Sequence, residues 1–96
     1  MITEFKLGGV TWKVSVDNKG LDKEQSFGTC DYNISEVRIQ LNTLGDERSE
    51  EEIQRTLYHE ITHAILDTMG ERELSNNEQF ITTFSSFLHQ FEKTKK

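Results

Sequence analysis

Several residue types and patterns that would point to particular classes of protein are scarce in this chain of 96 residues. A single cysteine, Cys30, excludes an intrachain disulfide, and the absence of proline leaves no marked boundary between domains. No stretch approaches the roughly 20 apolar residues of a membrane span. The N-terminal residues 1–9 also lack the charged-then-apolar pattern of a secretory signal. We therefore expect a soluble, cytoplasmic protein without a membrane partner.

Basic residues are also few, with 11 lysines and arginines against 17 acidic residues and a net charge of −6. A nucleic-acid-binding protein needs a concentrated basic face, so DNA and RNA are not expected partners. Apolar residues make up 33% of the chain and the mean hydropathy is −0.67. A chain of this length and composition can close one thin hydrophobic core. We expect a single domain that covers residues 1–96.

The first half of the chain has the period of β-strands. Apolar and polar residues alternate over residues 3–7 and 10–17, and Gly8-Gly9 between them is typical of a hairpin turn. The polar stretch Asp17–Glu24 predicts a loop. Two further extended runs, Ser26–Tyr32 and Glu36–Leu41, flank a turn at residues 33–35. The pattern predicts three to four antiparallel strands.

The second half changes to the period of α-helices. From Glu50 to Met69 apolar residues recur every three or four positions, after a capping-box pair at Ser49 and Glu52 and before Gly70. A short linker, residues 71–74, leads to a second helical pattern that ends near Lys93. Four phenylalanines share one face of this second helix and are predicted to be core: Phe80, Phe84, Phe87 and Phe91. Strands followed by two long helices indicate an α+β fold, with the helices on one face of a small sheet.

The first helix contains the pattern H-E-x-x-H, formed by His59, Glu60 and His63. Residues four apart on a helix project from the same face, so the two imidazoles can reach one zinc ion. Glu60 is turned by roughly 100° from His59 and lies beside such an ion, where a carboxylate can accept a proton from water. A helical wheel places the histidines opposite the apolar stripe of this helix. We expect them to face a cleft or solvent.

A catalytic zinc site uses three protein ligands, so a third one is needed. The candidates are acidic residues after the first helix and one further histidine: Glu71, Glu73, Glu78 and His89, with Asp67 more remote. Glu78 lies fifteen positions after His63, which is far enough for the second helix to fold back across the first. We select Glu78, although a capping box of Ser75 with Glu78, or of Asn76 with Gln79, would also explain an acid there.

These residues resemble the minimal zinc metallopeptidases of the gluzincin type, in which H-E-x-x-H is followed by a glutamate ligand on the next helix. They are also similar to small phage- and prophage-borne metallopeptidase-like proteins. The resemblance covers about residues 28–91 and includes the pair Asn77-Glu78. It implies a zincin-like fold, Zn²⁺ held by His59, His63 and Glu78, and Glu60 as the general base. Thr82 stands where larger relatives place an aspartate that steadies a histidine, so Asp67 or a backbone carbonyl is the expected substitute.

The expected reaction is hydrolysis of a peptide bond in a peptide or protein substrate. Three residues are conceivable stabilisers of the oxyanion: Tyr32, Tyr58 and His89. The strand Glu36–Leu41 is a conceivable rim for an extended substrate, or simply a charged sheet edge. Cys30 is expected to be a buried, unreactive thiol.

Two rival hypotheses remain open. In one, the same scaffold is a zinc-binding protein-interaction module that does not cleave its partner, which a lobe of this size favours because it has little surface with which to enclose a substrate. In the other, the chain is a metal-free α+β protein. The sequence predicts neither the oligomeric state nor the identity of the substrate.

Overall fold

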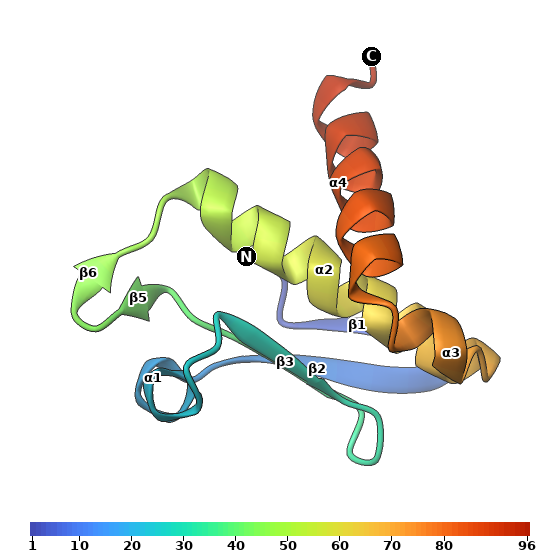
Figure 1. The fold of residues 1–96 in the computed structure, drawn as a ribbon, viewed down its shortest axis with the longest axis horizontal. Coiled ribbons are helices and arrows are strands. Elements are labelled where there is room, and N and C mark those ends of the chain that lie inside the picture. The colour runs from blue at the N-terminus through green and yellow to red at the C-terminus, as the bar shows by residue number, and fades with distance from the viewer.

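The computed structural model describes all residues from 1 to 96 and shows a small sheet covered on one face by helices (Figure 1). The strands are β1 (Glu4–Leu7), β2 (Val10–Val16), β3 (Gly28–Asp31), β4 (Glu36–Ile39), β5 (Asn42–Thr43) and β6 (Asp46–Glu47). The helices are α1 (Asn18–Glu24), α2 (Glu50–Met69), α3 (Arg72–Ser75) and α4 (Glu78–Thr94). The predicted α+β class is confirmed. No helix has both the length and the apolar content that a bilayer crossing requires.

The main sheet has four strands in the order β1-β2-β4-β3. The pairs β1-β2 and β3-β4 are antiparallel, as predicted, but β2 and β4 run parallel, with Val14 opposite Val37. Parallel neighbours need a crossover connection rather than a tight turn. That connection contains α1, which replaces the predicted loop over residues 17–24. The Asp17 side chain caps α1 by accepting a hydrogen bond from the Gly20 amide at 3.0 Å.

The hydrophobic core lies between the sheet and α2. Its buried residues come from β2, β4 and α2: Trp12, Val14, Val37, Ile39, Leu57 and Ala64. The strand residues alternate with polar neighbours, so only one face of the sheet is apolar. The bounds of α2 agree with the prediction, because the Ser49–Glu52 capping box is formed at its start and Gly70 ends it with φ +79°.

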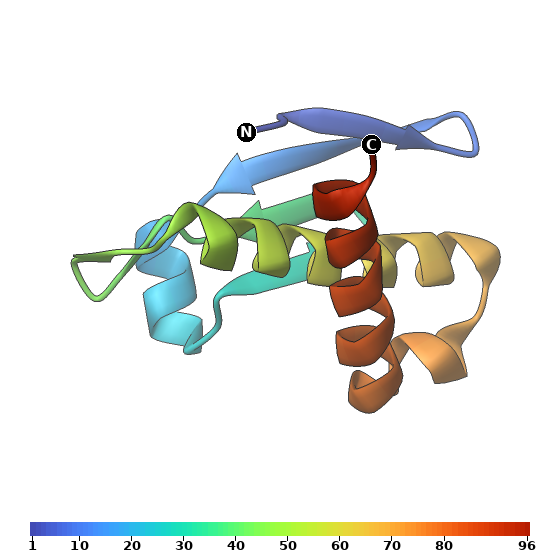
Figure 2. The ribbon, with the colours of Figure 1, turned by 90° about the horizontal axis from the view of Figure 1, so that it is seen from above.

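Helix α4 crosses α2 steeply on the side away from the sheet, and its C-terminal end extends beyond the helix layer (Figures 1 and 2). It packs on α2 through a narrow strip that includes the buried residues Ile81 and Ser85. The predicted phenylalanine core is wrong, since three of the four side chains are exposed: Phe84 by 48%, Phe87 by 66% and Phe91 by 60%. No sheet lies on that side of α4 to bury them.

A close approach of β3 to α2 depends on Gly28. A Cβ atom at this position would lie 2.7 Å from Cγ2 of Thr56, 3.1 Å from Cγ of Glu60 and 3.2 Å from the Arg38 carbonyl oxygen. Cβ contacts under 3.0 Å are essentially never seen, so any side chain here would push the strand from the helix. The absence of a side chain at residue 28 therefore sets the distance between β3 and the part of α2 that carries Glu60.

We expect Gly28→Ala to lower the free energy of unfolding by about 1–3 kcal/mol, the usual cost of overpacking. Thr56→Ser removes the methyl group that would clash and keeps the hydroxyl that accepts a hydrogen bond from Arg48 at 2.7 Å. The double variant should therefore recover part of the loss in urea denaturation. If Gly28→Ala unfolds at the wild-type midpoint, β3 does not need this close approach.

Candidate metal site

The two histidines of the H-E-x-x-H pattern lie one helical turn apart on α2. Their ring centroids are 5.2 Å apart with an interplanar angle of 62°. Both rings face the start of α4 rather than the sheet, which agrees with the helical wheel. Both side chains are mostly buried, with 27% of the His59 side chain and 16% of the His63 side chain exposed.

Glu78 closes the arrangement from the first position of α4. One carboxylate oxygen lies 3.2 Å from Nε2 of His59 and the other lies 3.3 Å from Nε2 of His63. The cap of α4 is Asn77, whose side chain accepts a hydrogen bond from the Phe80 amide at 3.0 Å. Neither of the predicted capping boxes is used. Because Asn77 caps the helix, the Glu78 carboxylate is free to face the histidines.

Ligand atoms of His59, His63 and Glu78 all lie within 4.8 Å of one another, and they form the only group of this kind in the chain. Two imidazole nitrogens and one carboxylate oxygen are a donor set typical of catalytic zinc, with a fourth position left for water. The residues present therefore fit a zinc ion. The alternatives Glu71, Glu73, Asp67 and His89 do not join this group.

A serine supports His63 from behind. Nδ1 of His63 lies 3.1 Å from Oγ of Ser75. Ser75 belongs to α3 and is only 5% exposed. The expected support from Asp67 or a backbone carbonyl is wrong for this histidine. Sequence reasoning missed Ser75 because it considered the residue only as a helix cap, and residues 71–74 were predicted to be a linker rather than the start of α3.

Burial lowers the pKa of His59, and the neighbouring His63 contributes in the same direction, while the Glu78 carboxylate opposes the shift. A lowered pKa keeps the imidazole neutral near pH 7, which is the form that offers a lone pair to a metal. The site thus presents a neutral nitrogen from a largely buried ring. This protonation state suits metal binding.

Glu60 is 7% exposed and points to the β3 side of α2. It lines a pocket of about 270 Å³ together with His59, Arg55, Thr56 and the β3 approach at residues 26–28. Burial raises the pKa of the Glu60 carboxyl to about 8, and the Glu78 carboxylate adds to the rise. At pH 7 a carboxyl with this pKa is mostly protonated, so Glu60 would act as a base only when a cation held by the neighbouring histidines lowers its pKa.

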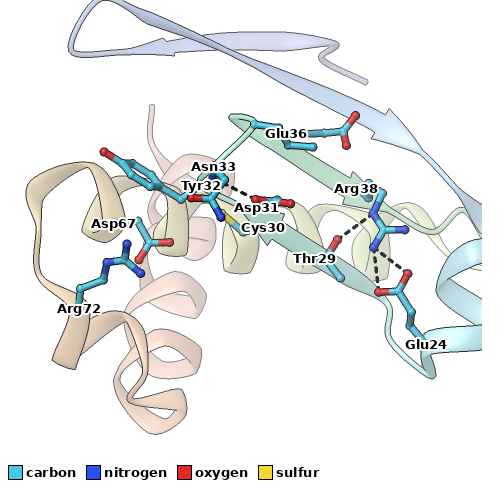
Figure 3. Close-up of a pocket in the computed structure, with 11 residues that line it drawn as sticks. Glu24, Thr29, Cys30, Asp31, Tyr32, Asn33, Glu36, Arg38, Asp67 and Arg72 are labelled. Carbon is cyan, nitrogen blue, oxygen red and sulfur yellow. Dashed lines mark hydrogen bonds and ion pairs between the residues drawn. The ribbon is translucent and has the colours of Figure 1, made fainter.

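Strand β3 is an outer strand of the sheet, so one of its edges is free. The predicted substrate rim, Glu36–Leu41, contains β4, which is paired on both sides and has no free edge. A pocket of about 650 Å³ lies along β3, between α2 and the outer face of the sheet. Figure 3 shows Tyr32, Asp67 and Arg72 at one end of it and Arg38 with Glu24 at the other.

The side chain of Ser26 covers one end of the free edge of β3. Its hydroxyl donates to the Gly28 carbonyl at 2.6 Å and accepts from the Gly28 amide at 3.4 Å. On the side that faces β4, the Phe27 carbonyl accepts a hydrogen bond from the Gln40 amide at 3.0 Å, one residue beyond the paired residues of β3 and β4. In an antiparallel pair, the amide and carbonyl groups of every second residue point away from the partner strand. The backbone groups of Gly28 and Cys30 therefore both point to the free edge of β3.

The remaining predicted residues lie outside the His-His-Glu group. Tyr58 and His89 stack on each other with centroids 5.2 Å apart, and Tyr32 lies beneath Arg72 at 5.6 Å. Cys30 is half-buried, and burial together with the Glu60 carboxylate raises the pKa of its thiol to about 12. A thiol with this pKa stays protonated at neutral pH, while the predicted full burial of Cys30 is wrong.

Comparison with known protein families identifies the chain. The SprT-like family matches residues 3–94, which is nearly the whole chain, and the protein belongs to this family. The family is related to the zincin-like zinc metallopeptidases, which agrees with the small sheet, the long α2 helix and the His-His-Glu group. The chain has no significant match among individual curated proteins or among solved structures.

We expect the wild-type protein to bind one equivalent of zinc, and His63→Ala and Glu78→Ala to lose it, because each removes one of three ligands. Ser75→Ala should weaken binding by about 10–100-fold, the usual effect of removing a hydrogen bond to a ligand. Competition against a chromophoric chelator measures these affinities.

His89→Ala is the matched control for these variants, since His89 lies on the same helix as Glu78 but outside the group. It should retain the wild-type affinity. Zinc retained in Glu78→Ala and lost in His89→Ala would move the third ligand to His89.

Proposed function

We propose that this protein is a zinc-dependent metallopeptidase in which His59, His63 and Glu78 hold the metal and Glu60 is the general base. The observation that carries the proposal is the juxtaposition of the three ligand atoms with a buried carboxyl that lines an adjacent pocket. Zinc bound at such a site polarises a peptide carbonyl and makes a water molecule more acidic. Membership of a family related to zinc metallopeptidases supports the same activity.

The residues of the chain divide the remaining work between them. Glu60 accepts a proton from the attacking water and returns it to the leaving amine. A cation held by His59, His63 and Glu78 would lower the raised pKa of Glu60 and keep its carboxylate ionised for the first transfer. Ser75 fixes the orientation of the His63 ring. Gly28 lets β3 approach Glu60 closely, which excludes water from one side of the carboxyl.

The free edge of β3 is the proposed binding position for an extended peptide. The backbone of Cys30 can pair with a substrate strand, and the pocket that lies along β3 has room for side chains of that strand. At the Gly28 end the Ser26 hydroxyl must rotate away before a substrate can pair there. The strand thus leads a peptide towards Glu60 and the histidines.

We expect Glu60→Gln to retain zinc and to lower the rate of peptide hydrolysis by about 10²–10⁴-fold, the usual contribution of a general base. The glutamine has nearly the same shape but cannot accept the proton. Cleavage of an unstructured protein such as casein, followed by mass spectrometry of the products, measures the rate. Arg55→Gln, a change in the same pocket, is the control and should remain active.

The alternative function is a zinc-binding interaction module without turnover. The form of the site favours it, because both pockets beside β3 are open to solvent rather than enclosed by residues 1–96. In that case wild type and Glu60→Gln would bind zinc equally and neither would cleave any peptide. Equal cleavage by both proteins would instead show that Glu60 is not the base.

A further inference from the structure

The exposed phenylalanines of α4 form a continuous apolar stripe, consisting of Phe80, Phe84, Phe87 and Phe91. Phe80 and Phe84 stack with their centroids 5.6 Å apart, and the last three residues are 48–66% exposed. At 100° per residue the centre of the stripe lies about 130° from the side of α4 that carries Glu78, Ile81 and Ser85. The stripe therefore points away from the metal site and from the buried contact with α2, and only Phe87 borders a pocket that Glu51 and Arg55 of α2 also line.

The spacing of the stripe is that of a helix-pairing surface. The intervals of four, three and four residues are those of alternating a and d positions in a coiled coil. The exposed residues that flank the stripe on one side are uncharged, namely Thr83, Ser86 and Gln90. A helix that lies on an anionic membrane surface carries lysines and arginines along its polar face, whereas the only lysine within α4 is Lys93, in its last turn. The pattern favours a second helix over a lipid surface.

We propose that a second copy of this chain covers the stripe, with the two α4 helices packed antiparallel about a twofold axis. In that arrangement Phe84 of one copy lies beside Phe87 of the other, and Phe80 lies beside Phe91. All four phenylalanines of each copy then contact the other copy. The stripe is self-complementary, as an interface between identical subunits related by a twofold axis requires.

The charges along α4 select the antiparallel orientation. Before the helix, Glu71 and Glu73 are exposed and outnumber Arg72, so this end carries excess negative charge. At the other end three lysines outnumber Glu92, and two of them also make ion pairs within the chain, Lys93 with Glu51 and Lys95 with Glu92. Antiparallel packing brings the lysines of one copy to the acidic end of the other. Parallel packing would place the two positively charged helix ends side by side, which is unfavourable.

The area of the stripe sets the strength of the dimer. Three phenylalanines of this exposure offer about 300–400 Å² of aromatic surface, since each side chain can bury about 150–250 Å². A stable interface buries about 800 Å² per partner. The stripe supplies half of this area or less, so we expect a weak dimer that forms only at high protein concentration.

Sedimentation equilibrium of the wild type across a range of concentrations tests the proposal. Phe87→Glu places a charge at the centre of the stripe and should leave the protein monomeric at concentrations where the wild type is dimeric. Ile34→Glu, which changes an equally exposed residue in the β3-β4 turn, should remain dimeric. Circular dichroism of Phe87→Glu should match the wild type, because the side chain makes no core contact.

Cysteine cross-linking tests the orientation. Thr83 and Gln90 flank the stripe on the same side, and they face each other across the twofold axis only in the antiparallel pair. A mixture of Thr83→Cys and Gln90→Cys proteins should form a mixed disulfide dimer under mild oxidation, while each variant alone forms little. Native Cys30 is half-buried with a raised thiol pKa, so it reacts slowly.

Three results would overturn the proposal. A wild type that is monomeric at every concentration, or a Phe87→Glu variant as dimeric as the wild type, would exclude the stripe as the interface. Binding of monomers to vesicles of anionic phospholipid, abolished by Phe87→Glu, would show that the occupant is a membrane surface instead. Since the stripe faces away from the histidines, zinc affinity should be the same in Phe87→Glu and in the wild type.

Discussion

The crossing of α4 over α2 is the interaction on which the site depends. Two histidines on one helix supply only two ligand atoms, and the third comes from a residue fifteen positions later. Gly70 ends α2, α3 reverses the chain, and Asn77 caps α4, so that Glu78 occupies the first helical position opposite His59 and His63. The same reversal buries Ser75 against His63. A short segment of nine residues, Gly70 to Glu78, thus provides both a candidate ligand and the group that orients another candidate ligand.

The sheet shapes the candidate site by lying close to Glu60, and it supplies no side chain to the His-His-Glu group. Strand β3 lies at the edge of the sheet nearest to α2, and the missing side chain of Gly28 lets the strand come close to Glu60. This contact buries the carboxyl and raises its pKa, while the opposite edge of β3 remains free along a wide pocket. One strand therefore both shapes the environment of the proposed base and offers backbone groups to an extended ligand.

The phenylalanine stripe shows why helical periodicity does not identify a core. The sequence pattern of α4 is strongly amphipathic, and the simplest interpretation is that its apolar side faces the sheet. In the structure α2 already covers the sheet, and α4 contacts α2 through Ile81, Ser85 and the residues beside them. The spacing of apolar residues shows which side of a helix is apolar, but it does not show which part of the molecule packs against that side. An exposed apolar patch of this kind is typical of a surface that binds another molecule.

Local signals along the chain determined a large part of the result. The bounds of α2, its capping box, its terminal glycine, the α+β order of the elements and the juxtaposition of His59 and His63 all follow from residues close together in the sequence, because helix geometry and capping are local interactions. The parallel pairing of β2 with β4, the free edge of β3, the support of His63 by Ser75 and the exposure of the phenylalanines were decided only by the tertiary structure. Each depends on which segments, distant in the sequence, meet in space. Glu78 belongs to both groups, since its spacing made it a candidate and the packing of α4 on α2 brought its carboxylate to the histidines.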